Sequence, residues 1–97
     1  MDKRAILLHP DDNVATAISD LEKGDVTQIA GKADCVAVEQ VPFGHKIALK
    51  PISAGQAVIK YSKNIGLAAV DIEQGSCVHT HNIESQRGRG DRDGGKK

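Results

Sequence analysis

The chain has 97 residues, so it forms one domain at most, and a chain this short buries only about 60–65% of the surface that its unfolded form exposes. Its 13 basic and 13 acidic side chains cancel, so no overall field draws it to nucleic acid or to an anionic membrane. Phe43 and Tyr61 are the only aromatic residues, too few for a base-stacking platform. With neither a membrane-spanning apolar run nor a secretory signal, the sequence predicts a cytoplasmic protein.

The first part of the chain predicts one strand and one helix. Residues 4–9 are short and apolar and are closed by a proline, which favours a strand that ends in a turn. A short α-helix is predicted over about residues 13–23, because Asp12 or Asn13 can serve as N-cap and apolar residues recur at helical spacing. Gly24 then ends the helix.

After Gly24 the helical pattern disappears and short segments rich in Val and Ile follow, separated by Gly, Pro and Asp. These segments are residues 26–30, 35–39, 46–50, 57–61, 66–70 and 77–81. The sequence therefore predicts a mainly β domain with one short α-helix.

A small turn pattern recurs within this β region: an apolar residue, two polar or small residues, a glycine and then a valine. The copies are LEKGDV, ISAGQAV and IEQGSCV at residues 21–26, 52–58 and 72–78. The glycine of each copy, Gly24, Gly55 or Gly75, is available for a positive φ. Three such turns predict one compact β unit, strongly bent back on itself.

Cys35 and Cys77 are the only cysteines and form no CxxC pair, so neither a thioredoxin-like site nor a zinc knuckle is predicted. A disulfide between them stays open at this level. For Cys77 we predict burial as a small hydrophobe rather than metal ligation.

Two histidines stand one residue apart in EQGSCVHTHNIES, residues 73–85. If this segment is extended, His79 and His81 point to the same face, where they could transfer protons, ligate a metal or serve only as strand residues. His45 and Lys46 follow a Pro-Phe-Gly turn, which exposes them at the start of the next strand.

The last thirteen residues, 85–97, contain Gly, Arg, Lys and Asp and no apolar residue. This composition predicts a basic flexible tail. Arg87 and Arg89 are then either solvated side chains or part of a segment that orders against a partner.

These segments together resemble a known family. Gly44-His45-Lys46, the VIKY of residues 58–61 followed by Ile65-Gly66, and His79-x-His81-Asn82 occur in the same order in the small SAF-type domain of altronate and galactarate dehydratases. The resemblance covers residues 5 to about 91. It implies a β-clip fold over residues 1–84, followed by the tail at 85–97.

The resemblance also implies a function. The family's catalytic part, several hundred residues long, is missing here, so we expect the small subunit of a two-subunit dehydratase, active only with a large catalytic subunit. Such enzymes remove water from a 2,3-dihydroxy sugar acid and give a 2-keto-3-deoxy acid. The alternatives are the small subunit of a sulfolactate sulfo-lyase-like enzyme, or a non-catalytic module that binds a sugar acid, a polyol or a metal.

Residue types and resemblance together select the candidate site. The expected catalytic residues are His45, His79 and His81. The expected substrate-binding residues are Lys46, Asn82, Arg87 and Arg89. The family implies a divalent metal, iron or manganese, in the complete enzyme; the metal ligands stay unknown, with His79 and His81 as candidates on this chain. A homo-oligomer is left open.

Overall fold

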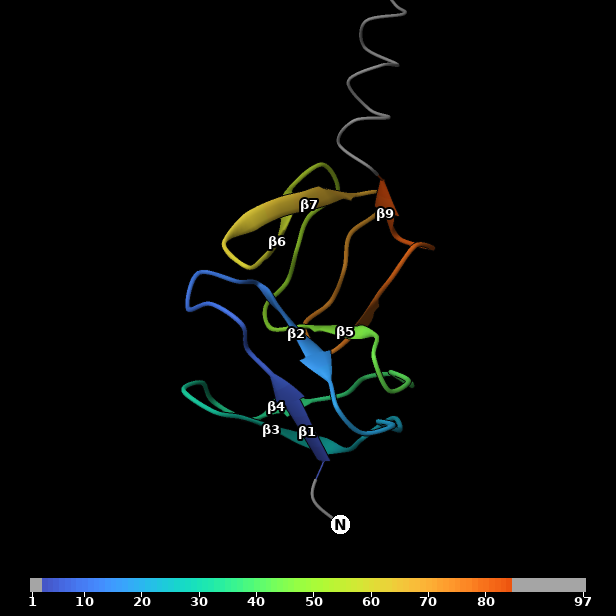
Figure 1. Cartoon of the computed structure of the whole chain (residues 1–97). Helices are drawn as coiled ribbons and strands as arrows, with labels where there is room; N and C mark the ends of the chain where they lie inside the picture. The colour runs from blue at the N-terminus through green and yellow to red at the C-terminus, as the bar shows by residue number, and fades with distance from the viewer. Residues whose placement is uncertain (1–2, 85–97) are drawn as a thin grey trace, which may run out of the picture.

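Nine short strands in two sheets form the structure (Figure 1), a computed structural model that describes residues 3–84. The strands are β1 (Lys3–Ile6), β2 (Val14–Ala17), β3 (Val26–Ile29), β4 (Cys35–Val36), β5 (Lys46–Ala48), β6 (Ala57–Lys60), β7 (Lys63–Ala68), β8 (Cys77–Val78) and β9 (Ile83–Glu84). The larger sheet has the order β4-β3-β1-β2-β5-β8, and β6-β7-β9 form the smaller one. Neighbouring strands are antiparallel except β1 and β3, which are parallel. The predicted mainly β architecture is confirmed.

Strands β2, β5 and β8 separate two hydrophobic cores. Because successive side chains of a strand point to opposite faces, Ile47 enters one core and Ala48 the other. Cys77 and Val78 divide in the same way, and so do Ala15 and Val14. These central strands are thus covered on both faces.

The helix predicted over residues 13–23 is wrong. Residues 3–84 contain no helix, and hence none that could cross a membrane. Residues 14–17 form β2 instead, and Ile18, which a helix would have buried beside Val14 and Leu21, is 39% exposed. A strand buried on both faces shows no alternation of apolar and polar residues, so VATA could be mistaken for part of a helix rich in alanine.

Asp12 and Asn13, expected to cap that helix, hold the β6–β7 hairpin. The buried Asp12 carboxylate accepts hydrogen bonds from the backbone N–H groups of Tyr61 at 3.0 Å and Ser62 at 2.8 Å. The Asn13 side chain donates to Ala57 O and accepts from Ile59 N–H. Their short polar side chains therefore satisfy backbone groups almost fifty residues away along the chain.

The recurrent turns are confirmed, and a fourth copy appears. Gly24, Gly55 and Gly75 have φ of 93°, 88° and 89°, and Gly44, in the Val-Pro-Phe-Gly turn, has 86°. Each turn closes an eight-residue segment that starts with a buried alanine and has a buried aliphatic residue at its fifth position. The segments are residues 17–24, 37–44, 48–55 and 68–75.

The four segments pair two by two. Leu21 and Val41 exchange two backbone hydrogen bonds, and Ile52 and Ile72 do the same. In every segment the turn glycine donates its N–H to the first alanine of the paired segment, at 2.7–2.8 Å. The domain therefore contains two copies of one bonding pattern, and each turn has an equivalent in the other three.

The tip of the β6–β7 hairpin offers a stability test. Tyr61 and Ser62 have φ of 57° and 62°, a conformation that costs an L-residue about 1–2 kcal/mol and glycine almost nothing. Ser62→Gly should raise the free energy of unfolding by about 0.5–1 kcal/mol in urea denaturation, because glycine's extra unfolded-state entropy offsets part of the gain. Ser53→Gly, at a turn position without positive φ, should lower it. A loss of stability with Ser62→Gly would contradict the strained geometry.

Candidate functional site

Two of the predicted histidines stack on each other. His45 directly precedes β5 and His79 directly follows β8, and these strands lie side by side in Figure 1. Their register pairs Lys46 with Val78, so one further step places His45 opposite His79. The ring centroids are 3.9 Å apart and the planes are inclined by 15°. The fold therefore brings together two of the three expected catalytic residues.

Cys77 contacts His45, one of the two stacked histidines. It is buried as predicted, and both cysteines are free thiols. Its Sγ lies 3.7 Å from Nδ1 of His45, and its backbone N–H donates to the Glu39 carboxylate at 2.9 Å. Burial, and then the negative charge of Glu39, raise the pKa of the thiol, against a smaller opposing effect of Lys46. The contact between Sγ and Nδ1 can be a hydrogen bond in either direction, depending on which ring nitrogen of His45 carries the proton.

Lys46 supplies a positive charge next to the stack. Its side chain is half-buried, and burial, followed by repulsion from Lys60, lowers its pKa. Lys46 and His79 line a cavity of about 270 Å³, together with Ile65, Thr80 and Ile83. An ammonium group that water solvates poorly binds a carboxylate more strongly than an exposed one does. We call His45, Lys46, Cys77 and His79 the histidine site.

The two histidines of the His-Thr-His segment do not share a strand face. β8 ends at Val78, and residues 79–82 form a turn in which Asn82 N–H donates to His79 O. His81 is exposed in this turn, whereas His79 is half-buried against His45. The prediction from strand alternation is therefore wrong, because the strand ends at Val78, before either histidine.

Asn82 is buried and holds this turn together. Its Oδ1 accepts a hydrogen bond from His79 N–H, and its Nδ2 donates to Cys77 O, both at 2.9 Å. Both ends of the amide are therefore used within the chain. This arrangement favours a role in positioning His79 over the substrate contact expected from the sequence.

His79 carries an unsatisfied polar atom. Its Nδ1 is buried and has no hydrogen-bond partner among the described residues. Desolvation, followed by the positive charges of His45, Lys46 and His81, lowers the pKa of His79 from its ordinary value of 6.5. The ring is therefore neutral at physiological pH, the form that can accept a proton.

The lowered pKa of His79 predicts how stability depends on pH. Below an ordinary histidine pKa of 6.5 the unfolded chain takes up a proton that folded His79 resists, so acid favours unfolding. This contribution to the free energy of unfolding should rise with pH from the lowered pKa up to about 6.5 and stay constant above it. Urea denaturation across about pH 5–7 should show the rise, and His79→Gln should flatten it. An unchanged slope in the variant would contradict this assignment.

The described residues do not fit a complete metal site. Within residues 3–84, no three His, Cys, Asp or Glu side chains converge on a point that could hold an ion. The stacked rings explain this, because the lone pairs of two parallel imidazoles lie in parallel planes and do not meet at one metal. His81, the other candidate ligand, is exposed in the turn.

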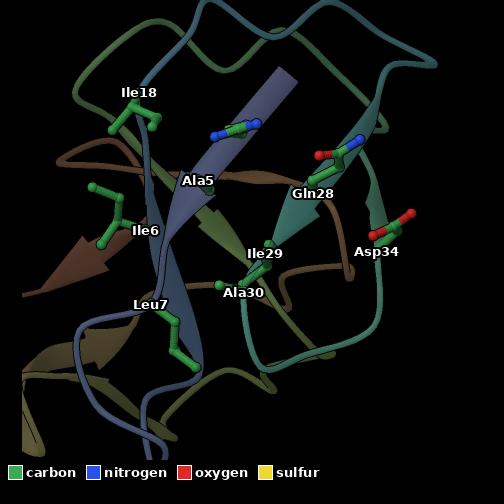
Figure 2. A pocket seen from close by; sticks show the side chains of 9 residues that line it. Ala5, Ile6, Leu7, Ile18, Gln28, Ile29, Ala30 and Asp34 are labelled. Atoms are coloured by element: carbon green, nitrogen blue, oxygen red, sulfur yellow. The ribbon is translucent and has the colours of Figure 1, made fainter. Parts of the chain in front are cut away.

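A larger cavity, of about 490 Å³, lies away from the histidine site. Figure 2 shows Ile6, Leu7 and Ile18 along one side of it and Gln28 and Asp34 along the other. None of the candidate site residues lines it. Arg87 and Arg89, like the whole predicted tail, lie outside the described residues.

Sequence reasoning found His45, Lys46 and His79 but missed Glu39 as a contact of this site. Nothing around Glu39 in the sequence indicates a site, because its contact with Cys77 spans 38 residues. The Gly-His-Lys and His-x-His-Asn segments were recognisable as motifs, but the strand pairing that brings them together was not.

Comparisons with known proteins agree with this picture. The model of the altronate/galactarate dehydratase SAF domain matches residues 3–86. The (2R)-sulfolactate sulfo-lyase subunit alpha of Paracoccus pantotrophus is 45% identical over 60 residues, which cover 62% of this chain and 81% of that subunit. Altronate dehydratase of Escherichia coli is 45% identical over 81 residues, 82% of this chain and 16% of that enzyme. Galactarate dehydratase (L-threo-forming) of the same organism is 34% identical over 73 residues, 75% and 14% of the two chains.

The chain thus spans about one sixth of the dehydratases it matches and most of the sulfo-lyase subunit. The match covers the whole described structure, including the histidine site. This chain therefore belongs to the family of altronate/galactarate dehydratase SAF domains.

Proposed function

We propose that the chain is the small subunit of a sugar-acid dehydratase, active together with a large catalytic subunit. The observation that carries this proposal is the histidine site: a neutral imidazole with an unpartnered nitrogen, stacked on a second imidazole and beside a half-buried ammonium group. These are the groups that elimination of water from a hydroxy acid requires.

The reaction needs a base, an acid and a positively charged group that offsets the negative charge of the substrate carboxylate. A base removes the proton next to the carboxylate, and the neighbouring hydroxyl leaves as water after it receives a proton, which gives an enol and then a 2-keto-3-deoxy acid. His79 is suited to act as the base because its pKa is lowered. Lys46 offsets the carboxylate charge, which otherwise opposes loss of the α proton. His45 or exposed His81 would protonate the leaving hydroxyl.

A large partner is needed because the cavity at the histidine site encloses too little space. The cavity beside Lys46 and His79, about 270 Å³, falls below the range of roughly 300–1,000 Å³ typical of ligand sites. The dehydratases that match this chain are about six to seven times as long as the matched region. The large subunit would close the site, exclude water and supply most of the substrate contacts. The divalent metal would be held there too, since residues 3–84 contain no complete site for it.

A second candidate function is that of a sulfolactate sulfo-lyase small subunit. The sulfo-lyase subunit and altronate dehydratase are equally similar to this chain, at 45% identity, and the subunit is of comparable length. Lys46 would serve a sulfolactate carboxylate in the same way. The two functions therefore differ in the group that leaves, which the large subunit must accommodate.

The test is to purify the chain with the product of a neighbouring reading frame of several hundred residues. The complex should then be assayed with altronate, galactarate and sulfolactate. Formation of a 2-keto-3-deoxy acid from a sugar acid would support the dehydratase, and release of sulfite from sulfolactate would support the second candidate. A complex inactive on all three, which still binds them, would instead indicate a non-catalytic binding module.

A further inference from the structure

We propose that Phe43 is the anchor by which the large subunit docks over the histidine site, an inference that rests on the proposed function. Phe43 is 66% exposed, more than any other large hydrophobic side chain in residues 3–84. It stands two residues before His45, in the turn that leads into β5. His45 is only two residues from Phe43 along the chain, so a partner that contacts this ring comes within reach of the histidine site.

The other three turns act as an internal control for this position. The residue before the turn glycine is exposed in all four copies. It is Phe43 in one copy, and Lys23, Ala54 and Gln74 in the other three. The fold therefore accepts a polar or small side chain here and gains no core packing from an aromatic one. Only the turn that carries His45 displays a phenyl ring, so the ring serves something outside the described residues.

Three hydrogen bonds fix the backbone of residues 43–45. Its N–H donates to the Asp20 carboxylate at 2.8 Å, Gly44 N–H donates to Ala17 O at 2.8 Å, and His45 N–H donates to Pro42 O at 2.9 Å. At the equivalent position of another turn, Ala54 N–H donates to the Asp71 carboxylate at the same distance, 2.8 Å. The turn therefore forms this hydrogen bond without an aromatic side chain, and the phenyl ring of Phe43 is not needed for it. An aromatic side chain on a fixed backbone has only two rotatable bonds to order on binding, and aromatic residues are typical interface anchors.

The occupant that fits is the large subunit rather than the substrate or a second copy. A sugar acid is covered with hydroxyl groups, and a phenyl ring offers them no hydrogen bond. A second copy would bring another open histidine site of the same kind and no missing catalytic groups. The large subunit has to reach the histidine site in any case, and we infer that it presents an apolar pocket of phenyl size beside its active site.

The test measures the dissociation constant of the chain for the purified large subunit, with turnover of the complex measured separately. Phe43→Ala should raise the Kd about 30-fold or more, whereas kcat at saturating small chain should stay unchanged. Phe43→Leu should recover part of the affinity. Matched controls are Lys23→Ala, at the equivalent position of another turn, and Tyr61→Ala, an aromatic residue exposed to 62% on the β6–β7 hairpin. Both controls should keep the Kd within about threefold.

An unchanged Kd for Phe43→Ala would overturn the inference, and so would an equal loss in Tyr61→Ala. A raised KM for the acid with an unchanged Kd would make Phe43 a substrate contact and overturn it too, as would dissociation of a homodimer in place of the complex. If the complex turns over none of the acids but Phe43→Ala still weakens it, the proposed function fails and the docking anchor stands.

Discussion

Replacing His79 with Ala should lower turnover of the complex with its large subunit by roughly 10²-fold or more, the scale for loss of a general acid or base. The reason is the position of His79, which lines the small cavity with Lys46 and has a buried nitrogen without a partner among residues 3–84. Its pKa is lowered, so the neutral base is the form present near pH 7. Steady-state kinetics at saturating small subunit would measure the loss.

Stability and assembly should change little in the same variant. His79 is half-buried, and removing its ring also removes the unsatisfied Nδ1, so the stack with His45 is lost without leaving a new unpaired group. His9→Ala, outside the histidine site, is the matched control and should keep full activity. We expect a smaller loss for His81→Ala, since His81 is exposed and does not join the stack. Full activity of the His79→Ala variant would contradict the catalytic role and would mean that His79 has only a structural one.

Gly75→Ala should destabilise the chain by about 3 kcal/mol or more, whereas Gly55→Ala should cost only about 1 kcal/mol. Both glycines have φ near 89°, so the conformational strain of an alanine is the same at the two turns. A Cβ at Gly55 would meet no atom within 4 Å, but one at Gly75 would overlap the carbonyl oxygen of Val36. Backbone cannot move aside as a side chain can, so the segments must separate.

The difference between these two variants isolates the close approach of residues 36–38 to the turn that contains Gly75. Gly75 O also accepts a hydrogen bond from Val38 N–H at 3.0 Å, so separating the segments would break that bond as well. Urea denaturation of both variants gives the comparison directly. Equal losses of stability would mean that the contact with Val36 adds nothing, and that only the positive φ matters.

The sequence by itself determined the features that depend on neighbouring residues. Turn glycines act through local φ preference, so Gly24, Gly55 and Gly75 were recognisable, and Val-rich segments between them indicated strands. The turn at Gly44 was predicted as a turn but not as a copy of the pattern, because Pro42 and Phe43 replace the polar or small residues of the other copies. Linear motifs such as Gly44-His45-Lys46 likewise indicated the family, because each lies within a few consecutive residues.

Tertiary structure decided what depends on residues far apart in the chain. Residues 14–17 became a strand because two cores bury them from opposite sides, a gain that outweighs the helix preference of their alanines. Asp12 does not cap a helix as expected. Its carboxylate instead accepts hydrogen bonds from the backbone N–H groups of Tyr61 and Ser62, which come near it only in the folded chain. The pairing of β5 with β8 made a site of His45 and His79, which are 34 residues apart. Strand register is set by burial on both faces of a sheet, and no local pattern in the sequence contains that information.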